Sequence, residues 1–303
     1  MLFLKNVPLQ NLTTIKIGGR VSFYAEPSDL KEISLCIDFS KSRDIPLFVL
    51  GNGSNTIFGD VRGLVVNLKN LKGFKVKEIK GKFFVEAFSG TPLKDLIRFS
   101  VKENVKSFYK LLGFPASVGG AVSMNAGAFG VEISDFLKEV YFVDWEGKLQ
   151  KAKRDELNFS YRKSPFPKLG IVFKVVFEFE RSKENILPKY EKIRRIRKEK
   201  QPINLPTSGS TFKNPEGNFA GKLLEKAGLK GFRLKNVGFS EKHANFLVNY
   251  GGGTFSEVVD LINIAKERVY ENFGIVLEEE VKLIESSGSD GWKVLGAHHH
   301  HHH

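Results

Sequence analysis

The chain has 303 residues, enough for two or three domains, and its 41% hydrophobic and 27% charged residues are an ordinary composition for a folded protein. One cysteine, and a single histidine outside the C-terminal His tag, exclude an internal disulfide and a metal centre built from several such residues, so we expect no metal. The net charge of +13 suits nucleic acid or small anionic ligands, and because most basic residues are interspersed with acidic ones we expect small anions and no nucleic acid.

The chain contains no run of about 18 apolar residues and no signal-peptide pattern. The sequence therefore predicts a cytoplasmic protein that does not bind membranes, and we expect a monomer. Residues 286–303 end in the His tag and are predicted to be linker and tag.

The first part of the chain predicts a β-α-β unit. Strands are expected over Val21–Ala25 and Leu47–Leu50, with an amphipathic helix between them over residues 27–42. The second strand runs into the loop Gly51–Thr56, GNGSNT, which is rich in glycine, asparagine and serine. Such a loop after a strand can gather backbone N–H groups around a phosphate. It lacks the third glycine of GxGxxG, and no GxxxxGK[ST] occurs, so a dinucleotide fold of the usual kind is excluded.

The middle of the chain predicts further strands and a second loop of small residues. Strands are expected over Gly63–Leu68 and Phe83–Phe88, and a helix over Thr91–Glu103. The segment Gly113–Gly130 is rich in glycine and alanine and carries no charged residue. Taken alone, this segment is explained equally well as a loop that binds no ligand. Two such loops in one chain favour a large nucleotide cofactor.

The next segment predicts a hairpin, a long strand and a basic helix. The hairpin joins Val140–Val143 to Lys148–Lys151, and the strand covers Ile171–Phe179. A helix from about Lys183 to Lys200 is expected to be surrounded by solvent because its basic residues alternate with acidic ones. The two prolines of Gln201–Pro206 then place a domain boundary.

The last third predicts a small α+β unit. Helices are expected over Phe219–Ala227 and Thr254–Phe273, followed by a final strand over Ile275–Leu283. That strand carries Glu278–Glu280, and strand alternation turns Glu279 to the opposite face from its two neighbours.

Four segments combine residue types that can perform chemistry. Arg162 lies among aromatic and hydroxyl residues, and its planar guanidinium can bind a carboxylate or phosphate through two bonds. The others are the polar loop Ser208–Pro215, the run Lys242–Asn245 with the only histidine outside the tag, and the acidic triplet Glu278–Glu280. Taken singly, each is also explained as a surface arginine, a turn, a structural histidine or solvated acids.

These segments carry a resemblance when they are taken together and in order. They are Gly51–Asn55, Met124–Gly130, Tyr161-Arg162-x-Ser164, Gln201-Pro202, Gly209-Ser210-x-Phe212-Lys213-Asn214-Pro215, Lys242-His243-Ala244-Asn245-Phe246 and Glu278-x-Glu280-Val281. The chain resembles the UDP-N-acetylenolpyruvoylglucosamine reductase family from Thr13 to about Ile284. Ala116 and Asn52 stand where glycine is usual, and both are small enough to keep the loops. The short spacing between Arg162 and Ser210 is similar to that of the short subtype.

The resemblance implies an α+β fold: a two-part FAD-binding domain of the vanillyl-alcohol-oxidase type and a smaller α+β substrate-binding domain. The expected bounds are 1–58 and 59–200 for the two FAD-binding subdomains and 201–285 for the substrate-binding domain. It also implies non-covalent FAD, with NADPH as co-substrate. The implied reaction reduces the enolpyruvyl ether of UDP-N-acetylglucosamine-enolpyruvate to UDP-N-acetylmuramate, in the peptidoglycan synthesis on which cell-wall growth, cell shape and division depend.

The resemblance also assigns roles to residues. Arg162 is expected to stabilise an enolate, Ser210 to deliver a proton to C2, and Glu280 to hold or polarise the substrate carboxylate. Cofactor contacts are expected from Gly51, Asn52, Gly53, Ser54, Asn55, Ser117, Gly119, Gly120, Asn125 and Gly127. Substrate contacts are expected from Tyr161, Lys213, Asn214 and His243.

Two alternatives stay open on the sequence alone. Another FAD oxidase of the same fold would share the two glycine-rich loops but not the remaining motifs, and no histidine or cysteine is placed for covalent flavin attachment. A non-catalytic binding protein, for example for nucleic acid, would rest only on the basic charge.

Overall fold

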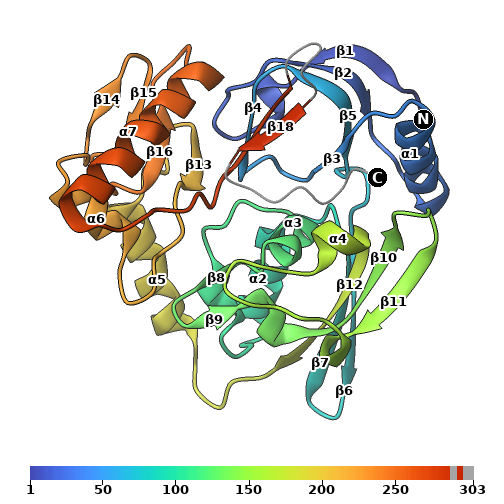
Figure 1. The fold of residues 1–303 in the computed structure, drawn as a ribbon. Coiled ribbons are helices and arrows are strands. Elements are labelled where there is room, and N and C mark those ends of the chain that lie inside the picture. Colours follow the sequence, from blue (N-terminus) through green and yellow to red (C-terminus); the bar gives the residue numbers. More distant parts are fainter. Residues whose placement is uncertain (287–291, 296–303) are drawn as a thin grey trace.

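The computed structural model describes residues 1–286 and 292–295, so most of the predicted linker and the whole His tag lie outside the described residues. Figure 1 shows three regions: an N-terminal one in blue, a middle one in green and a C-terminal one in orange. The last strands, in red, return to the blue region. Among the described helices, none has the length and hydropathy needed to cross a membrane.

The first region is a four-stranded sheet packed on one helix. Its elements are β1 (Leu4–Pro8), the 3-10 helix η1 (Gln10–Leu12), β2 (Arg20–Ala25), α1 (Leu30–Ser42), β3 (Leu47–Leu50) and β5 (Val61–Asn67). The sheet order is β1-β2-β5-β3, and both β2 and β3 run parallel to β5, which confirms the predicted β-α-β unit. Helix α1 begins after Asp29, whose carboxylate accepts a hydrogen bond from the amide of Glu32.

The second region is a five-stranded antiparallel sheet covered by short helices. Its elements are β6 (Phe74–Ile79), β7 (Lys82–Phe88), α2 (Leu93–Lys102), η2 (Phe108–Leu111), α3 (Val118–Ser123), β8 (Gly127–Ala128), β9 (Val131–Glu132), η3 (Ile133–Phe136), β10 (Leu137–Asp144), β11 (Leu149–Lys153), η4 (Arg154–Glu156), α4 (Phe166–Leu169) and β12 (Gly170–Glu180). The sheet order β11-β10-β12-β7-β6 confirms the predicted hairpin and the long strand. Its core is aromatic: the buried ring of Phe108 contacts those of Phe177 and Phe179.

The third region is a small sheet with helices packed against it. Its elements are α5 (Leu187–Lys200), β13 (Thr207–Ser210), α6 (Ala220–Lys226), β14 (Arg233–Leu234), β15 (Val237–Phe239), β16 (Phe246–Asn249) and α7 (Phe255–Phe273). Helix α7 begins with a capping box, in which the side chains of Thr254 and Glu257 each accept the other's amide hydrogen. Its core continues into the first region through Ile15, Ile17 and Ile57, so the two regions are packed together.

The chain ends by returning to the first region. Strand β4 (Thr56–Phe58) pairs in parallel with β17 (Lys282–Ser286), and β18 (Trp292–Leu295) adds to β17 within the predicted linker. The strand predicted over Ile275–Leu283 is wrong, because β17 begins only at Lys282. The residues before it make a single bridge, between Glu279 and Phe212. The amides of Glu280 and Val281 both donate hydrogen bonds to the carbonyl of Thr211. This irregular pairing holds the segment in place without forming a regular strand.

The expected domain boundaries at residues 58, 200 and 285 stay predictions. The sheet of the first region extends beyond residue 58 through β5, and α5 links the second region to the third. This arrangement brings the loop after β3, the segment around α3, and the start of the third region to the centre of the molecule (Figure 1).

Candidate active site

The loop after β3 presents backbone amides without partners. None of the amides of residues 51–55 donates a hydrogen bond to another described residue. The loop is fastened at both sides: the side-chain amide of Asn52 donates to the carbonyl of Pro115, and the amide of Thr14 donates to the carbonyl of Gly53 at 2.9 Å. Free amides on a fixed loop can bind the oxygens of an anion.

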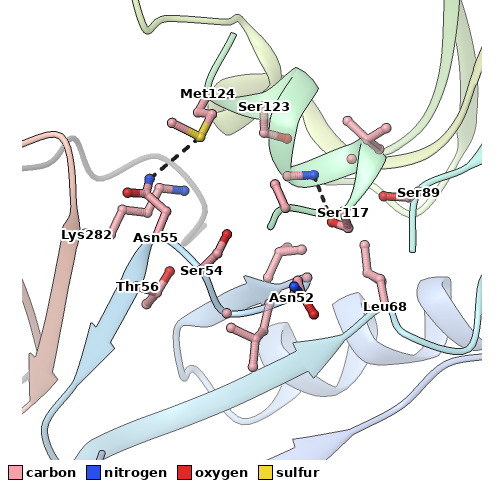
Figure 2. A pocket seen from close by; sticks show the side chains of 18 residues that line it. Asn52, Ser54, Asn55, Thr56, Leu68, Ser89, Ser117, Ser123, Met124 and Lys282 are labelled. Carbon is pink, nitrogen blue, oxygen red and sulfur yellow. Dashed lines mark hydrogen bonds between the residues drawn. The ribbon is translucent and has the colours of Figure 1, made fainter. Parts of the chain in front are cut away.

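The second glycine-rich segment faces this loop across a pocket of about 100 Å³ (Figure 2). The Ser117 hydroxyl caps α3 by accepting the amide hydrogen of Gly120 at 3.1 Å. A Cβ on Gly51 would lie 2.3 Å from the Ser117 oxygen, and one on Gly119 would lie 1.8 Å from the oxygen of Ser89. The absence of a Cβ at Gly51 lets the two segments approach each other closely, and its absence at Gly119 lets α3 pack against Ser89, which follows β7.

The close approach at Gly51 gives a testable prediction. Gly51→Ala is expected to weaken binding of FAD, the cofactor that the resemblance implies, by about 10- to 100-fold, because the added methyl group forces the loops apart. Titration of the apo-protein with FAD, followed by flavin fluorescence, measures this. Adding Ser117→Gly removes the obstructing hydroxyl and is expected to restore part of the affinity, the remainder being lost with the contact and the α3 cap that this hydroxyl provides. Wild-type affinity in Gly51→Ala would mean that the two loops do not enclose the cofactor.

A larger cavity of about 720 Å³ continues from this pocket, and Ser54, Asn55, Ala116 and Met124 line both. All three regions contribute to its wall. The three residues expected to be catalytic, Arg162, Ser210 and Glu280, line it together although they are far apart in the sequence. The cavity therefore joins a phosphate-sized cradle to a group of charged and hydroxyl side chains.

The centre of the charged group is a buried ion pair. The Nε of Arg162 donates to a Glu280 oxygen at 3.0 Å, and the side chains are only 14% and 8% exposed. A second guanidinium nitrogen donates to the carbonyl of Gly127 at 2.8 Å. Arg162 adopts a left-handed backbone conformation, with φ of 53°, in a tight loop closed by hydrogen bonds between Ser160 and Lys163. The tight loop, the ion pair with Glu280 and the hydrogen bond to the Gly127 carbonyl together fix the direction of the Arg162 guanidinium.

Burial dominates the electrostatics of Glu280. It raises the pKa of the Glu280 carboxyl above its usual value, and the positive charges of Arg162 and Lys213 oppose that rise. A carboxyl in this position can hold a proton more readily than one in water.

Of the four residues expected to contact the substrate, Asn214 and His243 line the same cavity. Lys213 lines a neighbouring cavity with Arg162 and Glu280 and forms an ion pair with Glu278 at 3.2 Å. Tyr161 lies behind them: its hydroxyl accepts the amide hydrogen of Asn214 at 3.0 Å, and the Arg162 guanidinium lies 4.9 Å from its ring centre. It holds neighbouring residues in place.

His243 is held by its neighbours and has a lowered pKa. Its Nδ1 accepts the amide hydrogen of Asn245 at 3.2 Å, and its ring packs on Phe246. Burial lowers the pKa of His243, and the positive charges of Lys230 and Lys200 act in the same direction. The imidazole is thus a neutral lining residue whose other nitrogen can serve as a hydrogen-bonding group.

Asn125, expected to contact the cofactor, is not brought into the cavity. Its side chain is fully buried, donates to the carbonyl of Ser160 at 2.8 Å and accepts from the amide of Ser134 at 3.3 Å. These hydrogen bonds join the α3 segment to the loop that carries Arg162. Asn125 therefore acts on the site indirectly, by holding that loop in place.

Two basic residues of the site, Arg197 and Lys282, are not predicted by any motif in the sequence. Arg197 was expected to be surrounded by solvent on the basic helix, and that expectation is wrong: it lines the large cavity, and burial lowers its pKa to about 10. Its guanidinium lies 5.3 Å from the ring of Phe114 and 5.6 Å from that of Phe129. Lys282 borders the pocket between the glycine-rich loops. Lys282 could have been suspected from the sequence, because it follows the expected catalytic residue Glu280 by two positions.

Comparisons with known proteins agree with this arrangement. The C-terminal domain of UDP-N-acetylenolpyruvoylglucosamine reductase matches residues 201–284, and an FAD-binding domain matches residues 21–153. The chain is 40% identical over 294 residues to UDP-N-acetylenolpyruvoylglucosamine reductase of Agathobacter rectalis, covering 93% of both chains. It is 38% identical over 284 residues to that of Lachnoclostridium phytofermentans, covering 92% of both.

A solved structure leads to the same conclusion. The crystal structure of UDP-N-acetylenolpyruvylglucosamine reductase from Thermus caldophilus is similar, with a TM-score of 0.76 and 33% identity, over 93% of this chain and 99% of that one. The predicted α+β fold with an FAD-binding domain is thereby confirmed. The chain belongs to the UDP-N-acetylenolpyruvoylglucosamine reductase family.

Proposed function

We propose that this chain is an NADPH-dependent FAD oxidoreductase that reduces the enolpyruvyl ether of UDP-N-acetylglucosamine-enolpyruvate to UDP-N-acetylmuramate, in peptidoglycan precursor synthesis. One observation carries the proposal: the buried Arg162–Glu280 pair and Ser210 line a cavity that opens into the pocket between two glycine-rich loops. Family membership supplies the identity of the substrate and of the reductant.

The two loops fit FAD. The free amides of residues 51–55 can bind its diphosphate, and the absence of a Cβ at Gly51 leaves the loops close enough to enclose a flat or anionic group. Bound FAD supplies the hydride chemistry, which side chains cannot provide.

The side chains of the cavity act on the enolpyruvyl substrate. Arg162 is positioned to bind the substrate carboxylate and to stabilise the negative charge that builds on it during reduction. The Ser210 hydroxyl delivers a proton to C2 of the substrate, a transfer that depends on fixed geometry and the exclusion of water. Glu280, with its raised pKa, holds the guanidinium and, when protonated, donates a hydrogen bond to the carboxylate.

The UDP-sugar is anionic, which suits the basic lining of the cavity. We assign its diphosphate and sugar to Lys213, Asn214 and His243, with Tyr161 orienting Asn214 through its hydroxyl. The net charge of +13 favours approach of FAD, NADPH and the UDP-sugar alike. We also propose that the enzyme is a monomer and works in the cytoplasm. Size-exclusion chromatography of the purified protein tests the monomeric state.

An absorption spectrum tests the function directly. The purified protein, reconstituted with FAD, is expected to show flavin bands near about 450 nm that bleach with NADPH under anaerobic conditions. The bands are expected to return when the enolpyruvyl UDP-sugar is added. Rapid recovery with oxygen alone would instead indicate an oxidase of the same fold. A protein that FAD cannot reconstitute would contradict the proposal.

A further inference from the structure

Lys282 occupies a place in the cofactor pocket that the proposed reaction does not use. It opens β17 opposite Thr56, and its amide donates to the carbonyl of Asn55 at 3.0 Å, at the end of the first glycine-rich loop. Figure 2 shows its side chain beside that of Asn55, on the side of the pocket toward Met124. Of the 18 residues that line this pocket, Lys282 is the only one with an ionisable side chain.

The ammonium group of Lys282 has no counter-ion within the described part of the chain. The three carboxylates that precede it in the sequence already have other partners: Glu278 pairs with Lys213, Glu279 with Lys266 at 2.8 Å, and Glu280 with Arg162. Burial lowers the pKa of Lys282, because it disfavours the charged form of the amine. An ammonium group held in such surroundings without an anion is energetically costly.

The location of the pocket identifies the anion. Lys282 borders the pocket formed by the free amides of residues 51–55 and by Gly119 and Gly120. It does not line the larger cavity that holds Ser210, although it also borders the neighbouring cavity lined by Arg162, Lys213 and Glu280. The amides offer neutral donors to a diphosphate, which carries two negative charges, and Lys282 alone in this pocket can offer a positive charge.

We propose that Lys282 is the counter-charge of the FAD diphosphate: its ammonium group binds a diphosphate oxygen in the pocket between the glycine-rich loops. The proposal rests on the proposed function, because it takes FAD as the ligand. It adds a cofactor-binding residue from β17, so a C-terminal strand contributes to a site otherwise built by the first two regions.

Lys282→Met is the test. Removing the charge is expected to weaken FAD binding by the apo-protein about 10- to 100-fold, and to make the remaining affinity less dependent on salt. Lys282→Arg keeps a cation and is expected to retain most of the affinity. Lys168→Met is the matched control, because Lys168 is exposed and lines the neighbouring cavity but not the pocket between the glycine-rich loops. Far-UV circular dichroism checks that each variant is folded.

The flavin midpoint potential distinguishes the diphosphate from the isoalloxazine ring. The diphosphate carries the same charge in oxidised and reduced FAD, so Lys282→Met saturated with FAD is expected to keep the wild-type potential. A lowered potential would place the lysine at the ring and overturn the proposal, as would unchanged FAD affinity in Lys282→Met. Failure of the wild-type protein to bind FAD would instead count against the proposed function itself.

Discussion

Replacing Ser210 by alanine is expected to slow reoxidation of the reduced flavin by the enolpyruvyl UDP-sugar about 10²- to 10⁴-fold, the range typical of a lost proton donor. Reduction of bound FAD by NADPH needs no proton from this hydroxyl and is expected to stay within about twofold of the wild type. We expect the effect on reoxidation because Ser210 lines the same cavity as the Arg162–Glu280 pair. Anaerobic stopped-flow absorbance measures the two half-reactions separately.

Thr211 offers a matched control for Ser210→Ala. Its hydroxyl is adjacent in sequence, fully buried, and without a hydrogen-bond partner among the described residues. Thr211→Val keeps the shape of the side chain and is expected to leave both half-reactions unchanged. Equal losses in both half-reactions of Ser210→Ala would contradict the role of proton donor and indicate a disturbed cavity instead.

Local patterns in the sequence predicted most of the elements. The capping residues Thr254 and Glu257 mark the start of α7, and the hairpin between β10 and β11 follows from its turn at residues 144–147. These features depend on residues close together in the chain, which is why one sequence suffices to predict them.

The site itself depends on contacts across the chain. Arg162 and Glu280 are separated by 118 positions, and no periodicity relates them. Their grouping with Ser210 followed from the family resemblance, and the shared cavity is what the structure adds. Arg197 shows the same limit, because helical spacing on a basic helix does not reveal which turn faces a cavity. The strand expected over Ile275–Leu283 failed because its alternating residues are held by contacts from separate elements.

Replacing Arg162 by methionine is expected to lower the free energy of unfolding by about 3–5 kcal/mol at neutral pH, because the change leaves a buried Glu280 carboxylate without its partner. Burial already raises the pKa of Glu280, and loss of Arg162 removes the main opposing influence, so the pKa rises further. The folded protein then binds the proton more tightly than the unfolded chain, whose carboxyl titrates near about 4.3. Stability is therefore lost as the pH rises through the folded-state pKa, and urea unfolding across this range measures the loss.

The double variant Arg162→Met/Glu280→Gln separates the charge from the packing. The amide cannot ionise, so this variant is expected to recover most of the lost stability and to lose the added pH dependence, although catalysis stays impaired. Recovery would mean that the loss of stability in Arg162→Met arises from the unpaired Glu280 carboxylate and not from a cavity left by the arginine. If the single variant were as stable as the wild type at neutral pH, the ion pair would not be the buried contact that fixes the direction of the Arg162 guanidinium.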